Sequence, residues 1–551
     1  MIMAKYKVKD GIGIIPDGAT EIENLAFDYC KDLKEVVIPD SVTSIGHSAF
    51  FYCINLPEIV LPYSIAKIGE LAFYRCKNLT RIVIPDLVTK IENHTFGYCT
   101  KLMDVVISRS VTEIGFRAFD VCKSLTKVVL PNSVTDIGSF AFHSCTNLTT
   151  VVLPESVQTI GQCAFSDCAG LNKLIIPESV KSIGYCAFVG CTALKKISVN
   201  ENNPKYDSRN NCNAIIESKT NTLILGCATT IIPNTLRKIG DSAFCHCEKL
   251  TKVVIPDSVT EIGDSAFDGC ENLSKVIIPD SVTKIGHLAF AGCIKLTKLV
   301  IPSSVVKIGN SAFSQCANLS ELVIPRSVTK IEDRTFMRCR NLKKVFIPDS
   351  VTKIGKYAFK GCSNLSEFVI PKSVTKIGGF AFGSCVGLRK ISVDEDNPSY
   401  DSRNNCNAII ESKTNTLIFG CAATVIPDSV TKIGSYAFNG CSALTGIGIP
   451  ESVKRIDYCA FEGCTELNEI TILCPISLNN FLKDCTSLKS ITLGVGIKGF
   501  SKDFFDGWSG NLEVINVPAN KTEYYKKRIP KHFHGIIKEL PAEKKPRKKN
   551  V

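Results

Sequence analysis

One pattern of apolar and polar positions recurs along the chain with a period of 23 residues. Its most regular marker is a phenylalanine, which recurs in three series and is replaced by leucine once near the end. The series run from Phe27 to Phe188, from Phe244 to Phe382, and from Phe438 through Phe461 and Leu482 to Phe505. A fixed period of this length is typical of a solenoid, in which each unit packs only against its neighbours.

The stretch 250–270, LTKVVIPDSVTEIGDSAFDGC, shows the unit most clearly. Leu250, Val253 and Ile255 are apolar, which predicts a strand that ends at Pro256, because proline has no N–H for a ladder. A second alternating segment over 258–263 predicts another short extended stretch. Residues 264–270 fit one helical turn with Asp264 as its cap. One such unit cannot bury its apolar side, but stacked units can.

The unit LxxVxIPxSVTxIGxxAFxxC resembles the BspA-type leucine-rich repeat, also called the Treponema-pallidum type, over about residues 12–518. The periodicity and this resemblance predict a β-rich α/β solenoid, a leucine-rich repeat superhelix of about 20 coils. They place one long parallel β-sheet on the concave face and short extended or helical turns on the other side. The resemblance also implies attachment to host proteins or to other cells.

Breaks in the period suggest the domain boundaries. Residues 1–22 form a partial repeat and N-terminal cap, 23–518 the solenoid, 519–540 a C-terminal cap, and 541–551 a disordered basic tail. Two nearly identical segments, near 200–233 and 394–427, interrupt the repeat, and each contains two β-prone runs around a Lys-Thr-Asn turn, which predicts a hairpin. The acidic cluster Asp394-Glu395-Asp396 lacks the spacing of a calcium loop and favours a solvated turn.

The distribution of charge and of cysteine along the chain limits the functions that the sequence supports. The net charge of +12 is concentrated at the C-terminal end, where residues 521–551 carry +8, so the rest of the chain is nearly neutral. Of the 27 cysteines, 18 follow the repeat phenylalanine or its replacement by three positions, which predicts a ladder of small buried thiols. The other cysteines share no metal-site spacing, so we expect no metal and no cofactor.

Neither catalysis nor a membrane span is indicated. The chain has seven histidines but no G-x-S-x-G, Walker A or H-E-x-x-H motif, so we expect no enzyme activity and no catalytic residues. No run of 18 apolar residues occurs, which predicts no membrane span. The N-terminus lacks the apolar core of a signal peptide and so favours the cytoplasm, whereas the resemblance implies a surface or secreted protein.

The middle residue of each first strand is the candidate binding surface. Side chains alternate along a strand, so this residue faces away from the core while its neighbours face inward. The series runs through Val37, Val60, Val83, Val106, Val129, Val152, Ile175, Val254, Ile277, Val300, Val323, Phe346 and Val369. We predict that the members from Val129 onward, flanked by Lys252, Lys275 and Lys298, bind a protein partner. Val and Ile could instead serve β-propensity alone.

A second series consists of lysines just before the Ile-Gly step: Lys284, Lys307, Lys330, Lys353, Lys376 and Lys432. These lysines fit a solvated face, with an anionic partner as the functional alternative. The solenoid sequence shows no interleaved basic and aromatic residues for base stacking, so nucleic acid is not expected as a partner. We therefore expect a monomer that acts as an adhesin-like protein-binding scaffold, or alternatively as an intracellular interaction scaffold.

Overall fold

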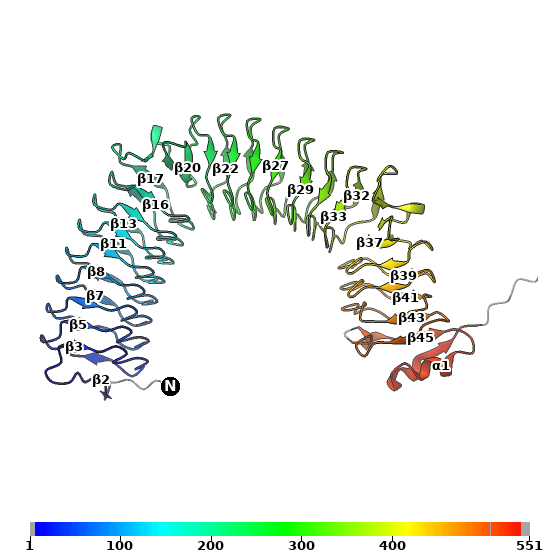
Figure 1. Ribbon diagram of the computed structural model, residues 1–551, viewed down its shortest axis with the longest axis horizontal. Helices are drawn as coiled ribbons and strands as arrows, with labels where there is room; N and C mark the ends of the chain where they lie inside the picture. Colours follow the sequence, from blue (N-terminus) through cyan, green and yellow to red (C-terminus); the bar gives the residue numbers. More distant parts are fainter. Residues whose placement is uncertain (1–5, 507, 542–551) are drawn as a thin grey trace, which may run out of the picture. The chain divides into compact units, whose positions relative to one another are not determined.

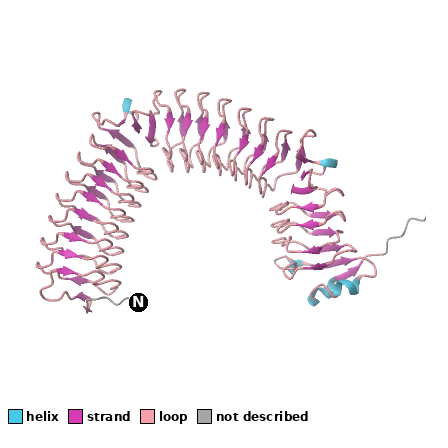
Figure 2. Cartoon of the chain, in the orientation of Figure 1, coloured by secondary structure: helices cyan, strands magenta, loops and turns pink. Residues whose placement is uncertain are grey.

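The computed structural model describes residues 6–506 and 508–541. The chain divides into two compact units, Met1–Leu273 and Ser274–Val551, and each is described by itself. In both units the chain winds through successive coils that lie side by side (Figure 1). Strands and turns make up nearly all of each coil, and helix is limited to a few short segments (Figure 2). The predicted solenoid is thus confirmed, as a β-solenoid with little helix.

Each regular coil of the unit Met1–Leu273 contributes a first and a second strand. The first strands are β2 (Ile12–Gly13), β4 (Glu35–Val36), β7 (Arg81–Val83), β9 (Asp104–Val106), β11 (Lys127–Val129), β13 (Thr150–Val152), β15 (Lys173–Ile176), β17 (Lys196–Val199) and β22 (Lys252–Val254). The second strands are β3 (Glu21–Ile22), β5 (Ser44–Ile45), β6 (Lys67–Ile68), β8 (Lys90–Ile91), β10 (Glu113–Ile114), β12 (Asp136–Ile137), β14 (Thr159–Ile160), β16 (Ser182–Ile183), β21 (Lys238–Ile239) and β23 (Glu261–Ile262).

The unit Ser274–Val551 follows the same plan. Its first strands are β24 (Lys275–Ile277), β26 (Lys298–Val300), β28 (Glu321–Val323), β30 (Lys344–Phe346), β32 (Glu367–Ile370), β34 (Lys390–Val393), β39 (Gly446–Ile449), β41 (Glu469–Ile472), β43 (Ser490–Leu493) and β45 (Val514–Val517). Its second strands are β25 (Lys284–Ile285), β27 (Lys307–Ile308), β29 (Lys330–Ile331), β31 (Lys353–Ile354), β33 (Lys376–Ile377), β38 (Lys432–Ile433), β40 (Arg455–Ile456), β42 (Ser477–Leu478) and β44 (Gly499–Phe500).

Parallel pairing between equivalent residues joins the coils. Val83 pairs with Val106 in the first-strand series, and Ile114 pairs with Ile137 in the second-strand series. The predicted parallel pairing is therefore confirmed, and the structure divides it between two series of short ladders on different sides of the coil.

The core of each unit is built from columns of identical side chains. The repeat phenylalanines stack on one another, with ring centroids 5.1 Å apart and planes 3° apart for Phe50 and Phe73. Offset stacking of this kind adds about 0.5–1.5 kcal/mol per pair to the area that is buried. The ladder cysteines lie beside them as free thiols. Each coil therefore completes the core of the coil before it.

The helical turn predicted for residues 264–270, and for its equivalents, is wrong. In each coil the residue before Ala-Phe and the residue four positions later adopt left-handed backbone, as with Leu71 (φ 58°) and Arg75 (φ 62°). The chain forms consecutive turns in which alternate N–H groups point to the next coil, and Phe73 N donates to Thr95 O across 2.9 Å. In a continuing α-helix, these N–H groups would donate to carbonyl groups of the same helix instead. The predicted cap at Asp264 is wrong too, because no helix begins there. At the equivalent position of the preceding coil, the Asp241 carboxylate accepts a hydrogen bond from the Asp264 N–H at 3.1 Å, which links the two coils.

The glycine after the second strand lets neighbouring coils approach closely. A Cβ added to Gly138 would lie 2.7 Å from the carbonyl carbon of Gly115 in the preceding coil, closer than real Cβ atoms approach backbone. Glycine is therefore required at this position for steric reasons, although its own φ is not left-handed.

A hairpin interrupts the stack once in each unit. In the first unit it comprises β18 (Tyr206–Asp207), the 3₁₀ segment η1 (Arg209–Asn211), β19 (Ile215–Glu217) and β20 (Thr222–Leu225). In the second it comprises β35 (Tyr400–Asp401), η2 (Arg403–Asn405), β36 (Ala408–Glu411) and β37 (Thr416–Gly420). The last strand of each hairpin then pairs in parallel with the next coil, β20 with β21 and β37 with β38. Glu395 and Asp396 lie in a turn.

The described ends of the chain close the stack differently. β1 (Val8–Lys9) pairs antiparallel with β2, and the Tyr6 ring meets Phe27 edge-on at 5.4 Å. At the other end follow η3 (Ser509–Asn511), α1 (Thr522–Lys526), η4 (Lys531–Ile536) and β46 (Ile537–Glu539), which pairs in parallel with β45. The domain boundaries drawn from the sequence stay a prediction. The tail expected at 541–551 lies outside the described residues, apart from Pro541.

Candidate functional site

The structure places every residue of the predicted apolar series on the surface. The thirteen side chains from Val37 to Val369 are between 43% and 79% exposed, whereas their strand neighbours, such as Val253 and Ile255, are buried. We call this set the aliphatic stripe. Since burying a valine is worth about 1.5–3 kcal/mol, each exposed member leaves that free energy available to a partner.

Pairing aligns the members of the stripe within each unit. Val129 lies opposite Val152 in one unit, and Val323 lies between Val300 and Phe346 in the other. A column of exposed charged or polar residues runs beside the stripe and includes the predicted Lys252, Lys275 and Lys298. Further along, Lys344 Nζ lies 2.7 Å from Glu367 Oε1, and this ammonium lowers the pKa of Glu367. The surface is therefore apolar along its middle and charged along its edge.

The hairpin interrupts the stripe in the first unit, where Val254 resumes it, and the strand members of the stripe end at the hairpin of the second unit. Ile175 pairs with Ser198, and Val369 pairs with Ser392, so serine replaces the aliphatic residue at both places. In the first strands that follow the hairpin of the second unit, this position is small or polar: Gly448, Thr471, Thr492 and Asn516. Asn516 Nδ2 donates to Thr492 Oγ1 across 3.2 Å, which makes a polar ladder. The stripe therefore has a defined end in this unit.

Sequence reasoning missed two exposed residues at the same coil position. Ile231 is 76% exposed and Val425 is 73% exposed, and each directly follows a hairpin. Both lie 13 residues before the repeat phenylalanine, at Phe244 and Phe438, and two residues before a proline. Counting back from the phenylalanine would have identified them, even though neither lies in a strand.

A hollow of about 600 Å³ lies over the N-terminal part of the stripe. Val37, Val60 and the highly exposed Tyr63 contribute to its lining. No first strand forms in the coil that contains Val60, which begins with Pro57, because proline supplies no ladder N–H. The first-strand ladder is interrupted here, between β4 and β7. The hollow is the place where a partner's side chain could enter between coils.

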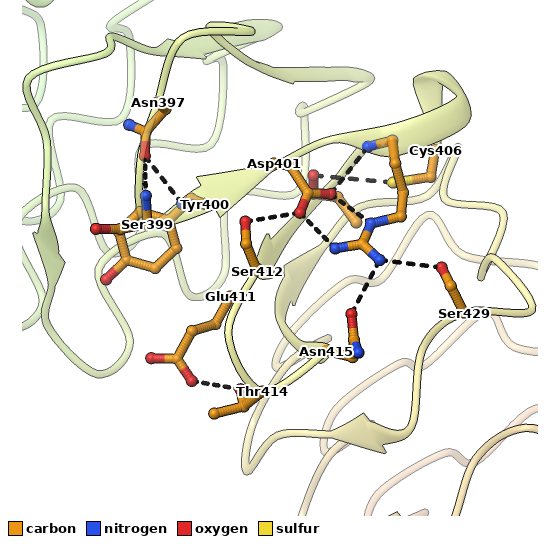
Figure 3. A network of polar contacts seen from close by, with 12 residues as sticks. Asn397, Ser399, Tyr400, Asp401, Cys406, Glu411, Ser412, Thr414, Asn415 and Ser429 are labelled. Carbon is orange, nitrogen blue, oxygen red and sulfur yellow. Dashed lines mark hydrogen bonds and ion pairs between the residues drawn. The ribbon is translucent and has the colours of Figure 1, made fainter.

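The hairpins carry a polar network that Figure 3 shows for the second unit. Arg403 grips the Asp401 carboxylate with two nitrogens, at 2.7 and 2.5 Å, and Ser412 Oγ donates to the same carboxylate at 2.7 Å. Burial acts to raise the pKa of Asp401, but the bonds from Arg403 and Ser412 outweigh it and lower the pKa. A third guanidinium nitrogen donates to Asn415 Oδ1 at 2.9 Å. These groups satisfy one another, so the network braces the hairpin.

The first hairpin repeats this network around Asp207 and Arg209. Arg209 Nε donates to Asp207 Oδ1 at 2.8 Å, Ser218 Oγ donates to Asp207 Oδ2 at 2.6 Å, and Arg209 reaches Asn221 Oδ1 at 2.8 Å. Because the two segments are nearly identical in sequence, the same contacts form in both units. This repetition also favours a structural brace over a unique site.

One buried cluster brings together serine, histidine and aspartate. Asp120 is 1% exposed and lies 2.8 Å from His143 Nδ1, while Ser144 Oγ lies 3.3 Å from His143 Nε2. However, Arg117 also holds Asp120 at 3.1 Å, and Asp167 lies 3.5 Å from His143 Nε2. Each ring nitrogen of His143 thus faces a carboxylate, and Asp167 shares Nε2 with Ser144, so the histidine is not reserved for the serine as it is in a triad. The cluster is better explained as an ion network than as a catalytic triad.

The expectation that the solenoid has no interleaved aromatic and basic surface is wrong. Arg75 Cζ lies 5.8, 5.6 and 5.3 Å from the ring centroids of Tyr52, Tyr74 and Tyr98. The rings also stack on each other, with Tyr29 and Tyr52 5.1 Å apart. Tyr29, Tyr52, Arg75 and Tyr98 are 23 residues apart and share one coil position, with Tyr74 at the position before it. The residue type at this position varies along the chain, so the cluster is not part of the repeat consensus. Because the ring faces are turned to each other, the absence of a nucleic-acid partner stays a prediction.

Neither a metal-binding cluster nor a membrane-spanning helix occurs among the residues that the structure describes. Within residues 6–506 and 508–541, His, Cys, Asp and Glu side chains form no group of three or more that could hold a metal ion. Over the same residues, no helix has the length and apolar character needed to cross a membrane.

Comparison with known proteins agrees with this geometry. The family model described as BspA type leucine rich repeat region (6 copies) matches residues 20–125, 112–220, 216–343, 283–410 and 419–529. A search of curated proteins found no match.

Solved structures of similar proteins are also leucine-rich repeat proteins. A leucine-rich repeat protein from Bacteroides ovatus is 23% identical, with 88% of this chain and 94% of that chain covered and a TM-score of 0.40. A leucine rich cell surface protein from Faecalibacterium prausnitzii is 29% identical. The match covers 71% of this chain and 85% of that chain, with a TM-score of 0.40. The leucine-rich repeat protein of T. pallidum is 35% identical. The match covers 34% of this chain and 87% of that chain, with a TM-score of 0.28.

Proposed function

Because this chain belongs to the BspA-type leucine-rich repeat family, whose scaffold suggests protein–protein binding, we propose that it binds a protein partner through the aliphatic stripe. The observation that carries this proposal is the exposure of all thirteen stripe residues, 43% or more each, beside buried neighbours in the same strands. Monomeric proteins rarely expose a continuous apolar patch of more than a few hundred Å². Solenoids commonly use the extended face formed by stacked repeats as a binding surface.

The charged edge indicates what kind of partner fits. In the unit Ser274–Val551 the stripe lies beside Lys275 and Lys298, followed by the paired Lys344 and Glu367. A protein with an apolar ridge and an acidic border near the first two lysines would complement both features. Leucine-rich repeat scaffolds are generally non-enzymatic, and binding alone accounts for this surface.

The test compares two variants of the full chain. Val300→Glu with Val323→Glu places charge in the middle of the stripe, where both valines are more than 60% exposed, so the fold is retained. Thr471→Glu with Thr492→Glu makes the same change at the equivalent position beyond the hairpin, where the surface is already polar. Proteins retained by immobilised wild type and by both variants, from an extract of the native cells and from a preparation of host extracellular proteins, are then identified by mass spectrometry.

We expect a partner that wild type and the threonine variant retain and that the valine variant loses by at least about tenfold, because burying an unpaired carboxylate costs several kcal/mol. Equal retention by the valine variant would overturn the proposal, and so would the lack of any specifically retained protein.

We propose more specifically that the protein acts in adhesion, which its membership of the BspA-type family supports. In that case the partner is an extracellular host protein or another cell, and the chain acts as a monomer outside the cell. The alternative is an interaction scaffold inside the cell. Fractionation of the native cells separates the two, since a chain found wholly in the cytosol cannot act in adhesion.

A further inference from the structure

Five lysines recur at one coil position on the second strands of the unit Ser274–Val551. They are Lys284, Lys307, Lys330, Lys353 and Lys376, each the first residue of its strand. Lys284 pairs with Lys307 in one sheet, and Lys353 pairs with both Lys330 and Lys376 in the next, so the series divides between β27 and β29. Because adjacent strands lie about 4.8 Å apart, the second group spans about 10 Å. We call the whole series the lysine ladder.

The other unit shows how this coil position is otherwise neutralised. There Lys90 pairs with Glu113, with Nζ 3.0 Å from Oε1, and Lys238 lies 3.8 Å from Glu261 across the same ladder position. In the lysine ladder, by contrast, like charges lie directly opposite one another, which is destabilising. A Glu332 carboxylate 3.3 Å from Lys353 offsets part of this charge. At the other end, the strand of Lys284 lies next to β23, which begins with Glu261. The positive charge that an anionic ligand would compensate lies at Lys307, Lys330 and Lys376.

A column of exposed threonines runs beside the lysine ladder. Thr352 Oγ1 donates to the Thr329 carbonyl at 3.2 Å, and Thr375 Oγ1 donates to the Thr352 carbonyl at 3.4 Å. Each hydroxyl has a single hydrogen, which these bonds use, so the exposed oxygens remain as acceptors. The face therefore offers ammonium groups and hydroxyl acceptors in adjacent rows from Thr329 to Lys376, whereas Val306 replaces the threonine before Lys307.

We propose that the lysine ladder binds a linear acidic polysaccharide. Such a polymer carries acidic groups at regular intervals for the lysines and free hydroxyl groups that can donate to the threonine oxygens. DNA supplies the phosphates but has no 2′-hydroxyl donor. An acidic peptide supplies carboxylates on flexible side chains, whose ordering costs binding free energy. The polysaccharide matches both rows of groups, and this site is separate from the aliphatic stripe.

The test uses the full chain and two variants of equal net charge. Lys330→Glu with Lys376→Glu breaks the ladder and reproduces the alternating signs seen at Lys90 and Glu113, so the fold is kept. Lys275→Glu with Lys298→Glu removes the same charge from the first-strand side of the same unit. Binding of heparin and of polygalacturonate is measured by titration calorimetry at low and at physiological salt, with duplex DNA and polyglutamate as the other polyanions.

We expect wild type and the Lys275 variant to bind an acidic polysaccharide within about twofold of each other, and the Lys330 variant to bind at least about tenfold more weakly. Binding should weaken steeply with salt. The proposal is overturned if wild type binds neither polysaccharide, or if the two variants lose affinity equally. It is also overturned if duplex DNA or polyglutamate binds as tightly as the polysaccharide does.

Discussion

The thiol of Cys316 donates a hydrogen bond to the carbonyl oxygen of Phe290 in the preceding coil, with Sγ and O 3.2 Å apart. Cys362 bonds to Phe336 at 3.3 Å and Cys385 to Phe359 at 3.2 Å in the same way. The repeat cysteine is therefore more than a small apolar side chain. It links the backbones of successive coils through a donor that exists only while the thiol keeps its proton.

This relationship predicts that alkaline pH destabilises the solenoid. Burial raises the pKa of Cys316 and of Cys385 from 9.0 to about 12. Since the folded-state pKa is raised, the contribution to stability is complete below pH 9 and is lost as the pH rises to 12. Each such thiol should lower the free energy of unfolding by about 1.4 kcal/mol per pH unit in that window. Urea unfolding at pH 8, 9 and 10 measures the slope.

The control for the alkaline slope is Cys316→Ala. This variant should be about 1–2 kcal/mol less stable than wild type at pH 8, because it loses a buried hydrogen bond and leaves a small cavity. Above pH 9, the free energy of unfolding of this variant should fall less steeply with pH than that of wild type, by about 1.4 kcal/mol per pH unit, the slope of one thiol. An unchanged slope would contradict the role assigned to the buried proton.

A second prediction concerns the buried carboxylate of Asp120. Asp120→Asn removes the charge that His143 and Arg117 share, at 2.8 and 3.1 Å, and should destabilise the chain by about 1–3 kcal/mol. Asp167→Asn is the matched control, because Asp167 is mostly exposed and lies 3.5 Å from the same histidine. That change should cost less than about 0.5 kcal/mol. Equal effects in thermal unfolding would show that burial of Asp120 does not matter.

The hairpin brace can be tested with Arg403→Lys. Lysine cannot hold both Asp401 oxygens and Asn415 together, so β36 and β37 should open more readily, by about 1–2 kcal/mol. Hydrogen exchange of their amides measures this opening. Lys413→Arg, an exposed change in the same hairpin, should leave exchange unchanged. Protection that survives Arg403→Lys would mean that pairing alone holds the hairpin.

Coil spacing can be tested with Gly138→Ala. The new methyl group would lie 2.7 Å from the Gly115 carbonyl carbon, so the coils must separate, at a cost of about 1–3 kcal/mol in thermal unfolding. Gly499→Ala should be nearly neutral, because no atom lies within 4 Å of its added Cβ. A tolerated Gly138→Ala would show that the stack can relax at this point.

Much of the fold could be read from the repeat. A 23-residue period places the same side chain at the same point of every coil, so Phe73 must face its own copies in the core and Val300 must face outward with its copies. Alternation within the strand separates the buried Val253 from the exposed Val254. The solenoid, its core and the exposed stripe therefore follow from the period and from the strand alternation.

The backbone conformation of the turns and the contacts between unlike side chains could be learned only from the tertiary structure. The turn around Leu71 and Arg75 has helical spacing in sequence, but left-handed residues direct its donors to the next coil, where they form bonds that a helix would have used internally. Arg75 lies 23 residues after Tyr52, and His143 lies 23 residues after Asp120, so the period places each pair at one coil position. The residue types at these positions vary from coil to coil, however, so the period does not say which contacts they make. The sequence thus determined which positions face each other in successive coils, and only the packing of coil on coil decided the backbone of the turns and the contacts of unlike side chains.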